Sequence, residues 1–140
     1  MNIEEAIAKS GGKNPLDTGS RKYAQELLAE GEELLFAYNA NFAIVPTDAP
    51  LVPKKVLSLN DKKSGVIAVT NNRVFVCNRV LGNATFKEIR KNNIQSVDEA
   101  SNALLGMGQV RIKGLTEYFI VDLNNKQRKT VNEFISSINQ

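Results

Sequence analysis

The sequence contains no histidine, and its 140 residues include a single cysteine, Cys77. Histidine is the usual general base and the commonest neutral metal ligand, so its absence argues against ordinary zinc or copper sites and against the commonest acid–base chemistry. One cysteine cannot form a disulfide within the chain, so no feature indicates an oxidising compartment. We therefore expect no metal, no cofactor and no enzymatic activity, and we expect Cys77 to be a buried, unreactive thiol.

Long apolar runs are also missing from the sequence. None approaches the ~18 residues that a membrane-spanning helix needs, and the first residues lack the basic and apolar regions of a signal peptide. These features predict a cytoplasmic protein. A content of 42% hydrophobic and 24% charged residues is typical of a folded chain, and a chain of 140 residues suits one domain.

The carboxylates form no evident catalytic pair. Asp98 and Glu99 are neighbours in a predicted strand, so their side chains point to opposite faces. Asp122 ends a later predicted strand without a second carboxylate beside it. The sequence thus predicts a protein that binds a partner rather than one that catalyses a reaction.

Charge is distributed unevenly along the chain. Residues 1–53 carry four lysine or arginine and eight acidic residues, a net charge of −4, whereas residues 54–140 carry fourteen and seven, a net charge of +7. An acidic segment of this kind can lie against a basic surface, in the same chain or in another. The alternative is that both segments are ordinary solvated surfaces.

The first 30 residues are expected to form a helical extension. Residues 2–9 predict a short, marginal helix, and residues 18–30 predict a second one that Gly31 ends in the left-handed conformation. We expect the second helix to pack on the main domain or on a neighbouring subunit, and the first to be loosely held. The predicted domains are therefore 1–30, the extension, and 31–140.

The rest of the chain has the pattern of a β-rich domain. Residues 65–70 and 73–77 are nearly continuous apolar strands, so both faces of this hairpin are expected to be buried. Asn71 and Asn72 between them predict a two-residue type I′ turn, in which both residues have positive φ. Further strands are expected over 34–44, 54–59, 85–89, 94–100, 109–113 and 116–122.

The last predicted element is an amphipathic helix. Val131, Phe134, Ile135 and Ile138 stand at i, i+3, i+4 and i+7, which places them in one apolar stripe. Antiparallel strands with short turns leave an open end. A terminal helix with one apolar stripe is suited to close that end.

Residues 31–138 resemble the pleckstrin-homology-like domains, and more closely their bacterial YokE-like branch. The most specific part is the run from Gly65 to Val76, a glycine, an apolar strand, Thr70, a two-residue turn, Arg73 and a second apolar strand. Residues 31–35, 94–97, 110–113 and 133–135 support it. The resemblance implies a mainly β (α+β) fold, a bent seven-stranded antiparallel barrel capped by a C-terminal α-helix, here with a short N-terminal helical extension. It implies no common catalytic activity.

Basic residues around the first loop are candidates for ligand binding. Lys54, Lys55, Lys62 and Lys63 flank this loop and are placed to meet anionic lipid headgroups, unless they keep a solvated loop soluble. Arg73 is a donor for a carboxylate or phosphate, unless it fixes its own turn. The Arg-X-Arg element of phosphoinositide-binding relatives does not follow Lys62 and Lys63, so no phosphoinositide preference is expected.

An apolar segment before the strand predicted over 109–113 is a candidate for protein contact. Leu104, Leu105 and Met107 lie at a predicted hairpin tip, where they either form an exposed patch or fold into the end of the barrel. We do not expect nucleic-acid binding, because the aromatic residues occupy core-like positions rather than alternating with basic ones. The sequence favours a non-catalytic binding or scaffolding module for a protein partner or for a second copy of itself. The alternative is a peripheral binder of anionic membranes.

Overall fold

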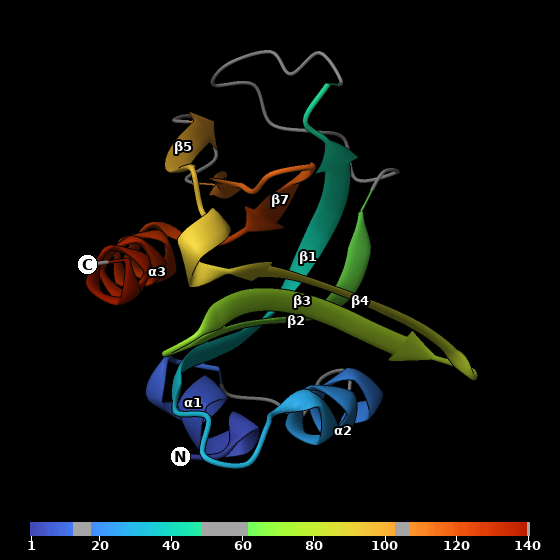
Figure 1. Ribbon diagram of the computed structural model, residues 1–140. Coiled ribbons are helices and arrows are strands. Elements are labelled where there is room, and N and C mark those ends of the chain that lie inside the picture. The colour runs from blue at the N-terminus through green and yellow to red at the C-terminus, as the bar shows by residue number, and fades with distance from the viewer. Residues whose placement is uncertain (13–17, 49–61, 103–106, 140) are drawn as a thin grey trace.

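The structure is a computed structural model that describes residues 1–12, 18–48, 62–102 and 107–139 (Figure 1). Two helices come first, seven strands follow, and a helix ends the chain. Their bounds are α1 Ile3–Lys9, α2 Thr18–Leu27, β1 Leu34–Pro46, β2 Lys63–Thr70, β3 Arg73–Val80, β4 Asn83–Arg90, the 3₁₀ turn η2 Lys91–Asn93, β5 Ser96–Asn102, β6 Met107–Lys113, β7 Glu117–Asp122 and α3 Asn125–Ile138. The strand predicted over 54–59 lies outside the described residues.

The seven strands form one antiparallel sheet with the order β4-β3-β2-β1-β7-β6-β5. The long strand β1 belongs to both halves, because its first part pairs with β2 and its second part pairs with β7. Phe42 sits at the junction, opposite Lys63 of β2 and Val121 of β7. The sheet bends about this strand into a half-barrel (Figure 1). The predicted fold is therefore confirmed, including the helix at its open side.

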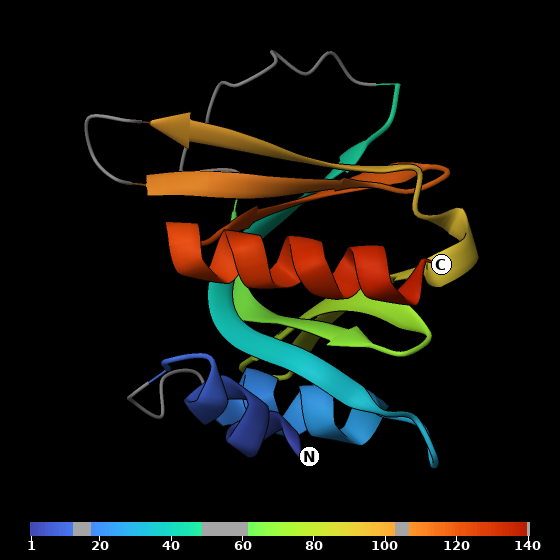
Figure 2. The same ribbon diagram turned by 90° about the vertical axis from the view of Figure 1, so that its left-hand side faces the viewer.

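The concave face of the sheet holds the main core, and α3 lies across it (Figure 2). Val131 and Ile135 of α3 are buried, and Phe134 and Ile138 pack against the same core with part of their surface exposed. The predicted apolar stripe of this helix is therefore confirmed. The buried strand residues of this core are Phe36, Phe42, Ile67, Val69, Val74, Val76, Ile89, Val110, Ile112, Phe119 and Val121.

A second core lies on the outer face of β1, β2 and β3, beneath the two N-terminal helices (Figures 1 and 2). Ile3, Ala6 and Ile7 of α1 are each 1% exposed, and the second helix contributes Ala24. The expectation that the first helix is loosely held is wrong, because the packing of its apolar face compensates for its short length. These helices also explain why β2 and β3 are apolar on both faces, as predicted.

The turn between β2 and β3 and the turn between β3 and β4 have backbone conformations that the sequence did not predict. Neither Asn71 nor Asn72 has positive φ, so the type I′ turn predicted between β2 and β3 is wrong. Instead, the Thr70 hydroxyl oxygen accepts hydrogen bonds from the backbone N–H groups of Asn72 and Arg73, both at 3.1 Å. Positive φ occurs in the next hairpin, at Leu81 (+49°) and Gly82 (+83°). A hydroxyl acceptor at the first turn thus replaces the left-handed backbone expected there.

Candidate functional site

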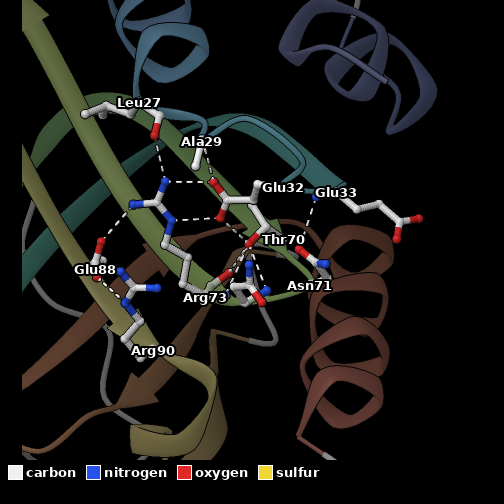
Figure 3. A network of polar contacts seen from close by, with 10 residues as sticks. Leu27, Ala29, Glu32, Glu33, Thr70, Asn71, Arg73, Glu88 and Arg90 are labelled. Carbon is white, nitrogen blue, oxygen red and sulfur yellow. Dashed lines mark hydrogen bonds and ion pairs between the residues drawn. The ribbon is translucent and has the colours of Figure 1, made fainter.

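A buried network of polar contacts centres on Arg73, at the start of β3 (Figure 3). The Arg73 guanidinium donates two hydrogen bonds to the Glu32 carboxylate, from Nε at 2.8 Å and from Nη2 at 2.9 Å. Its Nη2 also donates to the Leu27 carbonyl oxygen at 2.7 Å, and its Nη1 donates to Glu88 of β4 at 2.7 Å. One side chain thereby joins the end of α2, the segment before β1, and β4.

Glu32 receives more hydrogen bonds than the arginine alone supplies. The Thr70 hydroxyl donates to Glu32 Oε2 at 2.7 Å, and the backbone N–H of Ala29 donates to Glu32 Oε1 at 2.9 Å. The side chains of Glu32 and Arg73 are 3% and 9% exposed. Charged groups this deeply buried must be paired and hydrogen-bonded, and here both conditions are met.

The pKa of Glu32 shows which effect dominates in this network. Burial acts to raise this pKa, but the hydrogen bonds from Arg73, Ala29 and Thr70 and the charge of Arg73 together outweigh burial, and the pKa falls from its usual 4.5 to about 2. The hydrogen bond to Glu32 is the main cause that raises the pKa of the Arg73 guanidinium, against the opposing effect of burial. Both groups are therefore charged at neutral pH.

The structure places Arg73 inside the molecule and against internal partners. Besides its hydrogen bonds, its guanidinium carbon lies 4.8 Å from the ring centroid of Phe75, which adds a cation–π contact. This arrangement matches the alternative in which Arg73 fixes its own turn and the neighbouring strand. Glu32 and Glu88 had not been singled out from the sequence, and Thr70 had been named only as part of the motif from Gly65 to Val76. The spacing of Thr70 and Arg73 across a two-residue turn was the one signal for part of the network.

The four lysines proposed as ligand contacts do not form one described cluster. Lys62 is an internal residue, since its side chain is 4% exposed and its Nζ lies 2.9 Å from Asp122 Oδ1. Lys63 is exposed and donates from Nζ to the Thr85 hydroxyl at 3.0 Å. Lys54 and Lys55 lie outside the described residues. The described part of the loop thus offers Lys63 alone to an external anion.

The apolar contact residues proposed from the sequence fall largely outside the described part of the chain. This applies to Leu104 and Leu105 and to the side chain of Met107, whose backbone pairs with Asn102 at the start of β6. The contact patch therefore stays a prediction.

A groove lies between β5 and α3. It has a volume of about 610 Å³ and is lined by Glu99, Lys129, Asn132, Glu133, Ser136 and Ser137. Strand β5 ends the sheet, so no described strand pairs with its outer edge. A salt bridge of 3.0 Å between Arg128 of α3 and Glu99, which lines the groove, joins β5 to α3.

The described residues show neither a group of three or more potential metal ligands nor a helix long and apolar enough to cross a membrane. What this architecture supplies instead is a bent sheet with a free edge, a capping helix and a groove between them. A family model described as a bacterial PH domain matches residues 28–140, most of the chain. The chain belongs to the bacterial PH domain family. PH domains are in general binding modules for proteins or lipids.

Solved structures that resemble this PH domain agree on the fold. The C-terminal domain of an unknown protein from Leishmania infantum matches with a TM-score of 0.58 and 13% identity over 89% of this chain and 99% of that one. The Vps36 N-terminal PH domain matches with a TM-score of 0.54 and 14% identity over 80% and 85%. The linker-DH/PH domains of p115-RhoGEF match with a TM-score of 0.50 and 10% identity over 99% and 38%.

At these identities, the likeness establishes the fold of the PH domain and nothing about its ligand. A comparison with curated proteins gave no match. The ligand has to be inferred from the surface of this chain.

Proposed function

We propose that this bacterial PH domain is a non-catalytic module that binds an extended segment of a protein partner in the groove between β5 and α3. The observation that carries the proposal is the position of this groove beside the free edge of β5. An edge strand presents a row of unpaired backbone N–H and C=O groups, and an added strand satisfies them. Such strand addition is a common mode of peptide recognition.

The side chains of the groove are suited to a polypeptide. Glu99 and Glu133 supply acceptors, Lys129 supplies a cation, and Ser136 and Ser137 are small hydroxyl residues on the exposed side of α3. Mixed charge and small polar groups fit the alternating side chains of an extended peptide, whereas an anionic membrane favours a surface of uniform positive charge. The internal salt bridge of Lys62 also weakens the membrane alternative.

The proposal retains four expectations of finer detail. Catalysis is not part of the function, because the sequence contains no histidine and no evident catalytic pair of carboxylates. The protein acts in the cytoplasm, and its family branch is the YokE-like one, which the motif from Gly65 to Val76 favours. The partner is a protein or a second copy of this chain.

Selection of peptides tests the proposal. A random-sequence peptide library displayed on phage is panned against the full chain, and the enriched peptides are titrated into ¹⁵N-labelled protein. We expect amide shifts along β5 and on the α3 residues 129, 133, 136 and 137. Replacement of Ser136 by tryptophan fills the groove and is expected to weaken peptide binding at least tenfold. The matched control is Ser64→Trp, which places the same ring on an exposed serine of β2.

Two outcomes would contradict this function. The first is the absence of any enriched peptide, or binding that Ser136→Trp leaves unchanged. The second is binding to phosphatidylserine vesicles that fades with salt and requires Lys54, Lys55 and Lys63, which would establish the membrane alternative instead.

A further inference from the structure

The hairpin between β3 and β4 ends in two exposed apolar residues. Leu81 is 97% exposed and Val80 is 48% exposed, and we call this pair the apolar knob. In Figure 1 the hairpin projects to the right, away from α3. Large aliphatic side chains gain nothing from solvent at such a position, so the knob is a candidate contact surface.

The backbone conformation of the knob is also unfavourable. Leu81 has a φ of +49°, and it is the sole non-glycine residue with positive φ in the described part of the chain. A type I′ turn takes asparagine, aspartate or glycine at this position, because leucine in the left-handed region is strained. A residue that is unfavourable for both backbone and solvent points to a role in binding.

A cavity that matches the knob lies between α1 and α3. Its volume is about 130 Å³, roughly four times the ~30 Å³ that one water molecule takes up in the liquid. The apolar part of its wall comes from Met1, Ala6, Leu35, Phe36 and Phe134. The four side-chain carbons of a leucine suit a space of this size. We call this space the α1–α3 cavity.

One polar atom of the α1–α3 cavity lacks a partner. Gln127 lines the cavity and is 4% exposed, and its Oε1 accepts no hydrogen bond within the protein. Its Nε2 donates to the Ser10 carbonyl oxygen at 2.6 Å, which fixes the orientation of the amide. A buried acceptor without a donor is costly, so an occupant that brings an N–H group is favoured.

The knob supplies both an aliphatic side chain that fits the cavity and an N–H donor for Gln127. Leu81 offers an aliphatic side chain, and the N–H groups of the two residues in a two-residue hairpin turn point away from the strand ladder. A free N–H beside the leucine is therefore available to Gln127 Oε1. The β3–β4 hairpin lies on a different side of the molecule from helices α1 and α3 (Figures 1 and 2). The knob of one chain therefore cannot enter the cavity of the same chain.

We infer that Leu81 of one copy inserts into the α1–α3 cavity of a second copy. The contact is head-to-tail, because each participant uses a different surface. A dimer formed in this way still has one free knob and one free cavity, so association continues beyond two copies as the concentration rises. The contact goes beyond the peptide groove of the proposed function and shares no residue with it.

Sedimentation velocity on the full chain over a wide concentration range measures this contact. We expect the weight-average mass to rise beyond that of a dimer with concentration. Leu81→Asn removes the aliphatic side chain and introduces a residue that prefers positive φ. It is expected to weaken association by roughly 10- to 150-fold, the equivalent of the burial of one leucine side chain, while the melting temperature rises.

Complementary variants separate this contact from a general loss of folding. Leu81→Asn keeps the cavity and loses the knob, whereas Thr130→Phe keeps the knob and fills the cavity. Each variant alone is expected to stay monomeric, and an equimolar mixture is expected to form a 1:1 complex that grows no further. The matched control is Leu115→Asn, at another exposed leucine, in the turn before β7, which is expected to associate like the original chain.

Three results would overturn the inference. They are a chain that stays monomeric at every concentration, a mixture of the two variants that forms no complex, and a Leu115→Asn variant that loses association as completely as Leu81→Asn does. None of them affects the peptide titration of the β5–α3 groove, so failure of this contact and failure of the proposed function are distinguishable.

Discussion

Replacement of Glu32 by glutamine tests how much the Arg73 network stabilises the fold. The variant keeps the shape of the side chain and removes the negative charge that Arg73, Thr70 and Ala29 bind. Ionised Glu32 stabilises the folded state by about 3 kcal/mol at neutral pH, because its pKa falls from 4.5 to about 2 and each tenfold change in an ionisation constant is worth about 1.4 kcal/mol. We expect Glu32→Gln to lower the free energy of unfolding by that amount at pH 7.

The same shift fixes how the loss depends on pH. A carboxyl whose pKa is lowered in the folded state contributes its full stability above the unfolded value, here 4.5, and loses it as the pH falls toward 2. The difference between the original chain and Glu32→Gln is therefore expected to be constant from pH 7 to about pH 5. It then shrinks to about half by pH 3, since protonated Glu32 resembles glutamine.

Urea unfolding followed by circular dichroism at pH 7, 5, 4 and 3 measures both quantities. The control is Glu33→Gln, since Glu33 is the exposed neighbour of Glu32 and its carboxylate belongs to no described ion pair. A control effect within about 0.5 kcal/mol is expected for such a surface position. A Glu32→Gln variant as stable as the control at pH 7 would refute the reasoning. So would a difference that stays at its full size at pH 3.

Two further predictions concern the N-terminal helices and the lysine pair at the start of β2. Ile7→Ala is expected to lower the free energy of unfolding by about 2–5 kcal/mol, because Ile7 is 1% exposed, and a loss as small as that of Lys9→Ala would contradict the packing of α1. Lys62→Met is expected to lower the free energy of unfolding by about 1–3 kcal/mol, because it leaves Asp122 without its ion pair. Lys63→Met is expected to change the free energy of unfolding by less than about 0.5 kcal/mol. Equal effects of the two substitutions in urea titrations would show that Lys62 is not internal.

The half-barrel was predictable because its signals are local. Residues 65–77 are apolar without interruption except at the turn, and the stripe of α3 repeats at helical spacing, so each element is defined by its own segment. The packing of α1 was not predictable in the same way. Its seven residues are too few to be stable alone, and what holds them is a surface formed by strands far along the chain.

The polar network around Arg73 could not be predicted from the sequence for a related reason. Glu32 lies 41 residues from Arg73, and no local pattern connects an acidic residue before β1 with an arginine at the start of β3. The type I′ turn between β2 and β3 was wrongly predicted for another reason. Asn71 and Asn72 tolerate positive φ without requiring it. The Thr70 hydroxyl binds the two turn amides, and the backbone stays in the ordinary region.

The packing of the N-terminal helices on the outer face of β1, β2 and β3 also bears on how the chain folds during synthesis. Helix α1 ends at Lys9, but its main partner, β1, pairs with β2, and this pair is complete only when the chain has been made as far as Thr70. At about 5–20 residues per second, the ribosome needs roughly 3–12 s to make the intervening 61 residues. Until β1 has paired, the first helix has no folded sheet to dock on and is too short to persist. Helix α1 thus becomes ordered only after strands that are made later than itself.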